Sequence, residues 1–527
     1  MSAYRVRVPR VLVLAVRLAL AVGSGLMLAA AFEPVALPWL MPIALAGFFL
    51  SVRGVRPRVG FVVGLAFGVA FYFTHIVWMR TVGTDAWIAL ASIEALFYGA
   101  LGAIVPLLSR LPFWPLWVAA AWSSMEFVRS GWPFSGMPWG RLAYAVADTP
   151  VAPSLAYVGA TGVSFALALL GALLTWLLIA RRGRHLLGLA GIAAVLVAVV
   201  AADVRPWQAE ETGRINVAAV QGNVPGPGND ILWDHRQVTR NHAEATIQLA
   251  ERVRAGTDEP PAFVVWPENS TAADPFSDGA DNAAIVSAVQ SVGVPVMVGG
   301  MVDGGPTHIY NQGIVWDPVT GPGERYTKRH PVPFGEYIPF RGVIDNWNFG
   351  RLAIIGRDMV AGTGKEPLTV AGTKVADAIC FDVAYDDVLD DQVARGARLV
   401  TVQTSNATFI FTHQIEQQFA ITRLRAIETG RYVVVASTNG LTGVIGPDGR
   451  VIARAQPRTT AVLDEQVGLV DALTPAVRLG PWPGRAFAVI TLGALLFAGL
   501  QGRRRRSVVR ASHPDAPDSP DQEMSLT

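Results

Sequence analysis

Long apolar segments dominate the first part of this chain, and one more lies near its end. Each approaches the roughly 20 residues with which an α-helix crosses about 30 Å of hydrocarbon. The first segment follows three arginines, as a signal peptide would, but it is too long for one and more apolar segments follow it. The pattern therefore predicts transmembrane helices at residues 11–32, 39–52, 59–77, 87–107, 112–128, 154–178, 185–200 and 487–500.

The positions of the arginines predict how these helices are oriented. Basic residues gather in the cytoplasmic loops of membrane proteins. If the N-terminus is cytoplasmic, every basic cluster falls on the cytoplasmic side, and the loops on the other side carry few basic residues. Both termini are then cytoplasmic, and residues 201–485 lie outside the cytoplasm. The clusters are Arg5/Arg7/Arg10, Arg53/Arg56/Arg58, Arg110, Arg181/Arg182/Arg184 and Arg503 to Arg506.

The residues between the seventh and eighth apolar segments follow a different pattern, in which short β-rich runs alternate with helical stretches. This alternation is typical of an α/β domain. We expect helices at residues 239–255, 281–292, 384–395 and 412–430. We expect strands at residues 215–220, 262–266, 295–299, 309–316, 374–379, 398–404, 432–437 and 441–445.

The chain is thus predicted to have four parts. Residues 1–203 form a multi-pass α-helical membrane domain, and residues 204–484 form an extracytoplasmic α/β domain. Residues 485–502 form a final transmembrane helix. Residues 503–527 form a basic cluster and a cytoplasmic tail, whose polar stretch from Ser507 onward we expect to be disordered.

The composition supports a membrane protein and argues against other classes. The chain is 51% hydrophobic and 16% charged, with a mean hydropathy of +0.37. Its net charge of +2 gives no reason to expect a nucleic-acid partner. No Cys/His cluster has metal-ligand spacing, so we expect neither a metal nor another cofactor. The scarcity of cysteine suits a compartment outside the cytoplasm, where stray thiols oxidise.

Two carboxylates, Glu94 and Glu126, fall in or near predicted membrane helices. Such groups either mark a transport pathway or face inward, where neighbouring helices satisfy them; we favour the second interpretation. The loop at residues 131–144 is rich in Trp, Pro and Gly. Its tryptophans would suit the interface between bilayer and water.

Cys380 is the only cysteine of the chain, and it ends an apolar run that is predicted to be a buried strand. It has no partner for an internal disulfide. Two interpretations remain. Cys380 is either a small buried apolar residue or a nucleophile, which requires a base and a cation from elsewhere in the chain.

Glu268 and Lys328 are candidates for that base and that cation. Glu268 follows a predicted buried strand, at the kind of sheet edge where α/β folds gather catalytic groups. Considered alone, it is better explained as a solvated loop acid or a helix cap. Lys328 lies in YTKRHPVPFGEY (326–337), which its prolines and glycine shape into a loop. Considered alone, it is a surface lysine, and His330 in the same loop is either another base or a structural residue.

The order of the motifs around these residues makes the pattern specific. WPEN (266–269), YTKRHPVPFGEY, ICFD (379–382) and RLRAIETGRYV (423–433) together resemble the carbon–nitrogen hydrolase (nitrilase) superfamily. Because membrane segments flank them, the chain up to its tail resembles the apolipoprotein N-acyltransferase family. The resemblance implies that the α/β domain is an α-β-β-α sandwich. It extends to VQGN (220–223), LWD (232–234), STNG (437–440) and IGPDG (445–449).

The resemblance also implies a role for each site residue. Glu268 is the general base, Lys328 stabilises the oxyanion and Cys380 is the nucleophile. Glu336 matches a second family glutamate near this triad, and Asp382 stands where the family often has Glu. The chain departs from the family at residues 405–409, where it has SNATF and many members have NDAWF.

These residue types suit acyl transfer through a thioester. A carboxylate takes the thiol proton, and the thiolate attacks an ester carbonyl whose oxyanion a cation stabilises. By resemblance, the donor is a membrane phospholipid, and the acceptor is the α-amine of the diacylglyceryl cysteine of an apolipoprotein. The expected location is the inner (cytoplasmic) membrane of a bacterium. Similar chains in some bacteria work with a polyprenol-phosphate mannose synthase, a possible partner at the cytoplasmic face.

Two other functions are compatible with parts of the pattern. A membrane-tethered amidase or nitrilase-type hydrolase would use the same triad, although a tether needs one helix rather than about eight. A transporter or non-catalytic scaffold would only bind ligands through its outer domain. A thioester trapped on Cys380 would exclude the scaffold, and a requirement for an amine acceptor would exclude the hydrolase.

A phospholipid donor poses a further requirement, because each CH₂ withdrawn from the bilayer costs about 0.8 kcal/mol. We therefore expect apolar loops to shield the acyl chain on its way to the thiol. The candidates are Trp347 and Phe349 in residues 340–359, Phe409 in residues 409–411, and Trp233. The alternative is that these side chains pack inside the domain.

Overall fold

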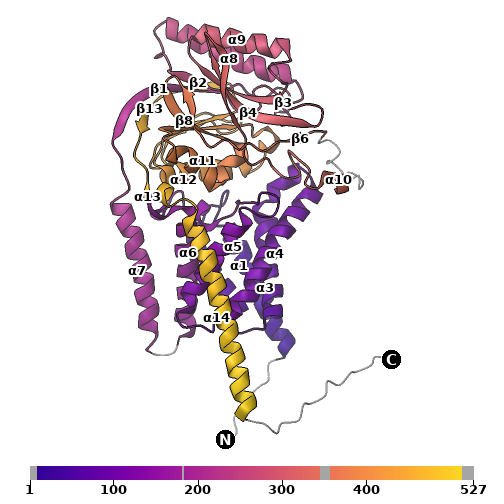
Figure 1. Cartoon of the computed structure of the whole chain (residues 1–527), viewed down its shortest axis with the longest axis vertical. Helices are drawn as coiled ribbons and strands as arrows, with labels where there is room; N and C mark the ends of the chain where they lie inside the picture. The colour runs from indigo at the N-terminus through magenta and orange to yellow at the C-terminus, as the bar shows by residue number, and fades with distance from the viewer. Residues whose placement is uncertain (1–8, 181–182, 345–355, 513–527) are drawn as a thin grey trace.

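A computed structural model describes residues 9–180, 183–344 and 356–512 of the chain. A helical bundle forms one end of the elongated molecule and an α/β domain forms the other (Figure 1). A helix is found at each of the eight predicted apolar segments. The bundle consists of α1 (Arg10–Ala29), α2 (Met41–Val52), α3 (Pro57–His75), α4 (Thr84–Leu108), α5 (Trp114–Arg129), α6 (Leu155–Ile179), α7 (His185–Val204) and α14 (Trp482–Ser512).

The bundle helices differ in length. Among the described residues, six helices are long and apolar enough to cross a membrane. The other two, α2 and α5, have 12 and 16 residues. At 1.5 Å per residue they reach only about 18 Å and 24 Å. The chain is therefore a membrane protein, whereas eight full crossings remain a prediction.

Facing glycines allow α3 and α4 to pack closely. A Cβ on Gly60 would lie 2.2 Å from the carbonyl oxygen of Gly102, and a Cβ on Gly102 would lie 2.3 Å from that of Gly60. Gly64 meets the carbonyl oxygen of Tyr98 at 2.2 Å in the same way. Membrane helices associate through such close backbone contacts, because lipid tails are as apolar as the helix surfaces. Any side chain at these glycines would push the two helices apart.

The α/β domain contains two stacked sheets. The first has the strand order β13-β1-β2-β3-β4-β5, with β6 beside β4, and the second has the order β12-β11-β10-β9-β8-β7. The strands are β1 (Glu211–Gln221), β2 (Phe263–Val265), β3 (Val296–Asp303), β4 (His308–Asp317), β5 (Gly321–Thr327), β6 (Asp358–Met359), β7 (Leu368–Val370), β8 (Thr373–Ile379), β9 (Leu399–Thr404), β10 (Val433–Ser437), β11 (Gly443–Ile445), β12 (Val451–Arg454) and β13 (Ala461–Val470).

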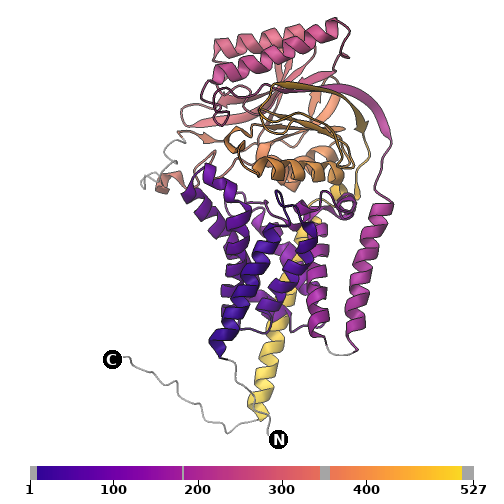
Figure 2. The same ribbon diagram turned by 180° about the vertical axis from the view of Figure 1, so that it is seen from behind.

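Helices cover both outer faces of the sheet pair. α8 (His235–Arg254) and α9 (Gly279–Val292) lie on the first sheet, away from the bundle. α11 (Asp386–Ala394) and α12 (Gln414–Thr429) lie between the second sheet and the bundle (Figures 1 and 2). This arrangement confirms the predicted α-β-β-α sandwich. Two further short helices are α10 (Arg341–Ile344) and α13 (Pro475–Leu479).

Each of the eight predicted strands is present, and the five additional strands share one property. β5, β7, β12 and β13 are the outermost strands of the two sheets, and β6 pairs only with β4. An edge strand is covered less completely than a central one and carries more polar residues. β12, for example, alternates between half-buried and exposed positions. The search for apolar runs therefore missed these strands.

The α/β domain begins and ends on neighbouring strands. β1 pairs antiparallel with β13, from Glu211 opposite Val470 to Gln221 opposite Ala461. α7 leads into β1, and β13 leads through α13 into α14. The whole domain is thus inserted between two helices of the bundle.

The C-terminal helix corrects one prediction. α14 continues to Ser512, so residues 507–512 of the predicted disordered tail are helical. Arginine is a good helix former, and cations are favourable at a helix C-terminus. The arginine run at residues 503–506 therefore extends the helix instead of ending it. Residues 513–527 of the predicted tail lie outside the described part of the chain.

Candidate active site

Cys380 directly follows β8, at the edge where the parallel strands β8 and β9 end. Its backbone has a φ of +53°, in the left-handed region that a residue with a Cβ rarely adopts. Such strained positions occur where a nucleophile is turned out of a strand at the start of a helical turn. The helical turn η7 (Cys380–Ala384) begins at this residue. The half-buried side chain therefore lies at the end of a strand rather than inside the core.

Glu268 follows β2 of the facing sheet, and both of its carboxylate oxygens are hydrogen-bonded. Oε1 accepts from Asn311 Nδ2 at 2.8 Å and from Lys328 Nζ at 3.2 Å. Oε2 accepts from the backbone N–H of Ser405 at 3.0 Å. The side chain is only 3% exposed. These bonds fix the carboxylate in place, as a general base requires.

Lys328 follows β5 and is buried between two carboxylates. Its Nζ lies 2.7 Å from Glu336 Oε1, in addition to its contact with Glu268. Burial would lower the pKa of Lys328, but the two glutamates outweigh it and hold this pKa well above its ordinary value. Lys328 is therefore a permanent cation. The other oxygen of Glu336 accepts from the backbone N–H of Val332 at 2.8 Å, which holds Glu336 beside the lysine.

Asp382 fixes the loop that carries Lys328. Its two oxygens accept hydrogen bonds from the Tyr326 hydroxyl at 2.7 Å and from the backbone N–H groups of Arg329 and His330 at 3.2 Å and 2.9 Å. Because Asp382 also lies two residues after Cys380, it ties Cys380 and the lysine loop together. Its contacts are those of a positioning residue.

The thiol of Cys380 is protonated when the site is at rest. Burial raises its pKa to about 12, and the nearby Glu268 carboxylate adds to the effect, while the Lys328 ammonium opposes it. A thiol with this pKa does not ionise spontaneously near neutral pH. It becomes a nucleophile when a base removes its proton as the new bond forms. The Glu268 carboxylate, which adds to the raised pKa of this thiol, is the candidate for that base.

The remaining predicted residues lie in different places. Trp233 is 66% exposed on the loop before α8. Phe409 is half-buried and packs edge-on against Trp78 of the bundle, with ring centres 5.3 Å apart. Trp347 and Phe349 lie outside the described residues. His330 stacks on Tyr385 at 3.7 Å and contacts Asp387, which supports its structural interpretation.

Sequence reasoning missed several residues that complete the site. Asn311 and Ser405 bind the Glu268 carboxylate, and neither belongs to a motif singled out above for catalysis. Trp139 was expected at the bilayer interface, but it is only 1% exposed and stacks on Phe381, with ring centres 5.9 Å apart. The bundle therefore contacts the residue directly after Cys380. Trp132 of the same loop is 65% exposed and keeps the predicted interfacial character.

Gln417 of α12 joins the bundle to the catalytic domain near this contact. Its side-chain oxygen accepts from the indole nitrogens of Trp78 at 2.9 Å and Trp139 at 2.7 Å. Its side-chain nitrogen donates to the carbonyl oxygens of Glu33 at 2.8 Å and His75 at 3.2 Å. One buried amide therefore holds three separate loops of the bundle.

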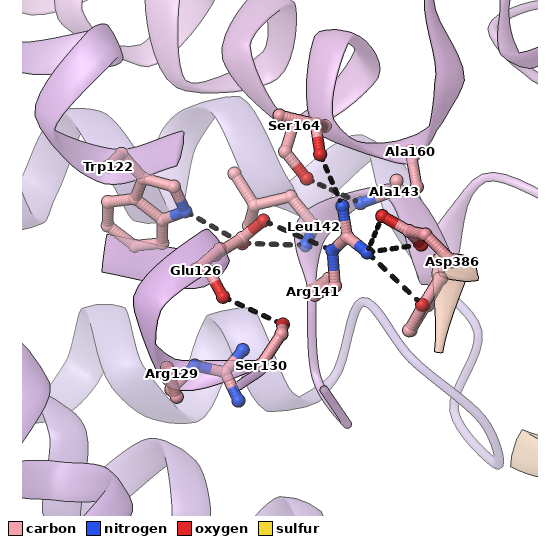
Figure 3. A network of polar contacts seen from close by, with 12 residues as sticks. Trp122, Glu126, Arg129, Ser130, Arg141, Leu142, Ala143, Ala160, Ser164 and Asp386 are labelled. Atoms are coloured by element: carbon pink, nitrogen blue, oxygen red, sulfur yellow. Dashed lines mark hydrogen bonds and ion pairs between the residues drawn. The ribbon is translucent and has the colours of Figure 1, made fainter. Parts of the chain in front are cut away.

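A second junction is centred on Arg141, which points toward Asp386 at the start of α11 (Figure 3). Its guanidinium binds the Asp386 carboxylate at 2.7 Å, and Glu126 lies on its other side at 4.0 Å. Glu126 also accepts from Trp122 at 2.9 Å and from the N–H of Leu142 at 3.0 Å.

The contacts of the two buried glutamates support the inward-facing interpretation. Glu94 pairs with Arg129 at 3.0 Å, and Glu126 is held as described above. Both carboxylates are therefore satisfied by neighbouring groups in and around the bundle. These contacts give no reason to assign either residue to a transport pathway.

Comparison with known proteins identifies both parts of the chain. Residues 24–173 match the model of the apolipoprotein N-acyltransferase N-terminal domain, and residues 216–472 match that of the carbon-nitrogen hydrolase family. An apolipoprotein N-acyltransferase from Mycolicibacterium smegmatis is 38% identical over 92% of this chain and 86% of its own length. One from Azotobacter vinelandii is 31% identical over 94% of this chain and 96% of its own length.

Solved structures show a weaker similarity over about half of this chain. A mutant of the Nesterenkonia AN1 amidase from the nitrilase superfamily is 16% identical over 50% of this chain and 93% of its own length, with a TM-score of 0.34. A carbon-nitrogen hydrolase from Helicobacter pylori G27 is 16% identical over 52% of this chain and 94% of its own length, with a TM-score of 0.35. Given the two family matches and the 38% identity over nearly its whole length, the chain belongs to the apolipoprotein N-acyltransferase family of enzymes.

Proposed function

We propose that this enzyme acylates the α-amine of the diacylglyceryl cysteine at lipoprotein N-termini, with a membrane phospholipid as acyl donor and Cys380 as nucleophile. One observation carries the mechanism. Lys328 lies within hydrogen-bond distance of Glu268, and Asp382, two residues after Cys380, binds the backbone directly after Lys328. Family membership supplies the lipoprotein and phospholipid substrates in general terms, whereas the residue roles are our proposal.

In the first half-reaction, Glu268 removes the thiol proton as Sγ attacks the ester carbonyl carbon of the phospholipid. The carbonyl oxygen becomes an oxyanion that the permanent cation Lys328 stabilises. The C–O bond to the glycerol then breaks, and Glu268 returns the proton to the departing lysophospholipid oxygen. Sγ now carries the acyl chain as a thioester.

In the second half-reaction, the α-amine of the lipoprotein attacks the thioester carbonyl. Lys328 stabilises the second oxyanion, and Glu268 accepts a proton from the amine. The C–S bond breaks as the amide forms, and the thiolate of Cys380 takes up the proton. Thioesters react readily with amines, so one difficult acyl transfer becomes two easier steps.

Glu336 and Asp382 support this chemistry by position. Glu336 shares the Lys328 ammonium with Glu268, which leaves Glu268 less strongly bound to the lysine than an isolated ion pair would be. Asp382 holds the loop behind Lys328 through three hydrogen bonds. We assign both as positioning residues.

We further propose that the catalytic domain lies outside the cytoplasm of a bacterial cell and that the chain sits in the inner (cytoplasmic) membrane. In Figure 1, α1 begins and α14 ends at the end of the bundle away from this domain. That end carries Arg53, Arg56 and Arg110 outside the long helices and Arg58 at the start of α3, and basic segments remain in the cytoplasm. A polyprenol-phosphate mannose synthase at that face stays a prediction from the resemblance.

Intact-mass measurement tests the mechanism. Purified protein incubated with phospholipid alone should gain one fatty-acyl mass, which hydroxylamine removes. Cys380→Ala should gain no mass and should have no activity. Full activity of Cys380→Ala would contradict the proposal, as would an acyl adduct on another residue.

The acceptor distinguishes a transferase from a hydrolase. Adding a diacylglyceryl-cysteine peptide to the acylated protein should discharge the thioester into the peptide amide. A peptide with an acetylated α-amine is the matched control and should leave the thioester in place. Equal discharge by both peptides, with release of free fatty acid, would favour the membrane-tethered hydrolase.

Thiol labelling tests the orientation. In the Cys380→Ala background, Gly279→Cys places a thiol at the start of α9, and Arg56→Cys places one in the basic loop before α3. A membrane-impermeant thiol reagent added to intact cells without an outer barrier should label only the first variant. Labelling of the second alone would reverse the proposed orientation.

A further inference from the structure

A cavity of about 540 Å³ lies at the end of the bundle opposite the catalytic domain. α2, α4 and α6 all end there, where α7 begins its path to the α/β domain (Figure 1). The acyl-transfer mechanism uses none of its residues. The cavity is lined by Arg17, Leu50, Arg53, Gly54, Pro106, Ser109, Arg110 and Ile179.

The lining carries three positive charges and no negative charge. Arg17 comes from α1, Arg53 follows α2, and Arg110 follows α4. In the part of the chain that the structure describes, no carboxylate forms an ion pair with any of the three. Three unneutralised guanidinium groups around one cavity repel one another, so the cavity favours an anion.

Arg17 is held in place within this group. It lies inside the otherwise apolar helix α1, where a charge is costly unless it is bound. Its Nη1 donates to the carbonyl oxygens of Ser51 at 2.6 Å and Arg53 at 2.9 Å. These contacts cap the C-terminal end of α2. They use one guanidinium nitrogen and leave the others for a ligand, since an arginine has five N–H donors.

Apart from Ser109, the rest of the lining is apolar, and it lies near the membrane surface. Leu50, Pro106 and Ile179 form hydrophobic parts of the wall. Close by in the chain, Trp114 at the start of α5 stacks on Trp176 near the end of α6, with ring centres 6.0 Å apart. Tryptophans gather at the level of lipid headgroups. A ligand here would meet guanidinium groups and apolar surface together, as a lipid headgroup with its glycerol backbone does.

We propose that this cavity binds the phosphate headgroup of an anionic glycerophospholipid. Guanidinium groups bind phosphate oxygens through paired N–H donors. The apolar wall favours a lipid over free inorganic phosphate. The bound lipid would be a structural ligand that joins the ends of α2, α4 and α6, separate from the acyl donor that reaches Cys380.

Lipid-dependent stability and lipid retention test this proposal on the full chain. Wild-type protein in detergent should melt several degrees higher with phosphatidylglycerol than with phosphatidylcholine, and native mass spectrometry should show phosphatidylglycerol retained. Arg53→Gln with Arg110→Gln should lose this difference. Arg56→Gln with Arg58→Gln is the matched control, because it removes two positive charges from the same end without touching the cavity.

The outcomes separate the possible ligands. The proposal requires that the control double variant keep the phosphatidylglycerol effect, that thioester formation on Cys380 stay within twofold in both double variants, and that millimolar inorganic phosphate stabilise the wild type less than the lipid does. Equal losses in both double variants would reduce the effect to overall charge and overturn the proposal. Equal stabilisation by phosphate would show an anion site without lipid selectivity and would also overturn it.

Discussion

The two helical layers of the sandwich occupy equivalent places in the fold but have opposite surroundings. α8, in the outer layer, buries one face through residues such as Val238 and Leu249 and exposes Arg236 and Arg240. This is the pattern of an ordinary amphipathic helix. α12, in the inner layer, is buried along nearly its whole length, polar residues included.

This difference between α8 and α12 shows how the sandwich is attached to the helical bundle. Buried polar groups are costly unless they are hydrogen-bonded. Gln417, Arg425 and Glu428 of α12 all find partners in the bundle: Trp78 and Trp139, Tyr144, and the N–H of Ala160. Such bonds are satisfied in only one relative position of the two parts. The inner layer therefore fixes the orientation of the active site toward the bundle, whereas the outer layer only covers a sheet.

The two layers should differ most in stability when a charged residue is replaced in each. Arg425 pairs with Glu428 and with Asp386, the latter at 2.8 Å, and donates to the Val383 carbonyl at 2.8 Å. Arg425→Ala would leave the buried Glu428 carboxylate without its cation, whereas Asp386 keeps Arg141, and it should destabilise the protein by about 3–5 kcal/mol. Arg240→Ala in α8 should change stability by less than about 0.5 kcal/mol. Unfolding of both variants in detergent measures the difference, and equal effects would contradict the distinction.

A neutral substitution should give a smaller effect in the same direction. Gln417→Ala removes the acceptor of two buried indole N–H groups, and each unsatisfied donor costs about 1–3 kcal/mol. For two donors we expect a loss of about 2–3 kcal/mol, at the low end of their sum, together with slower acylation of Cys380, because Trp139 would no longer be held against Phe381. Gln290→Ala, at an exposed position of α9, is the control. Wild-type acylation by a destabilised Gln417→Ala would show that the indole contact does not position the nucleophile.

A buried carboxyl between the two sheets, Asp377, should make the stability of the protein depend on pH. Burial raises the pKa of Asp377 to about 8, whereas a hydrogen bond from Thr401 opposes the rise. Asp377 Oδ2 and Gln403 Oε1 each lie 2.3 Å from the point where a Cβ of Gly313 would be. Gln403 donates its amide to the Trp266 carbonyl at 2.6 Å, and neither its oxygen nor Asp377 Oδ2 has a hydrogen-bond partner among the described residues, so a proton on Asp377 would supply a donor in this pocket of acceptors.

The sign of this pH dependence follows from the raised pKa. The folded protein holds the Asp377 proton up to about pH 8, and the unfolded chain releases it near pH 4. Between these values stability should fall as pH rises, by at most about 1.4 kcal/mol per pH unit. Asp377→Asn keeps the donor and should flatten the curve, which unfolding measured from pH 5 to pH 8 will show. An unchanged slope would mean that Asp377 is ionised in the folded protein.

The smallest effect on stability is expected at Trp233, on the exposed loop before α8 of the outer layer. Trp233→Ala should change stability by less than about 0.5 kcal/mol, because the side chain is 66% exposed. If Trp233 shields an acyl chain, the variant should acylate more slowly with long-chain phospholipid in membranes and normally with a short-chain soluble ester. Equal rates with both donors in variant and wild type would remove Trp233 from the lipid path.

Features with a strong local signal were predictable from the sequence. The eight bundle helices and the central strands each carry an apolar run, and the positions of Glu268, Lys328 and Cys380 followed from strand ends together with family motifs. The edge strands lacked such a run. Asn311 and Ser405 also lacked a signal, because their role arises only when strands far apart in the sequence meet around Glu268.

The junction between sandwich and bundle was the least predictable part. Trp139 has the sequence context of an interfacial tryptophan, yet its indole is buried between Gln417 and Phe381. Arg141 belongs to the loop at residues 131–144, where nothing in the sequence indicates its partner, and it pairs with Asp386 across the junction. The composition of a segment indicates whether it prefers lipid or water. It does not indicate which other segment of the chain will pack against it.

The insertion of the α/β domain between α7 and α14 sets the order in which the protein can be assembled. α14 packs on helices made much earlier: Phe487 stacks on Phe165 of α6, with ring centres 4.6 Å apart, and Gly484 lies against the ring of Phe127 in α5. During synthesis, seven helices emerge before the domain, and their surface for α14 stays open to lipid until residues 205–481 have been made. The bundle therefore closes last, with a helix that arrives only after the catalytic domain has left the ribosome.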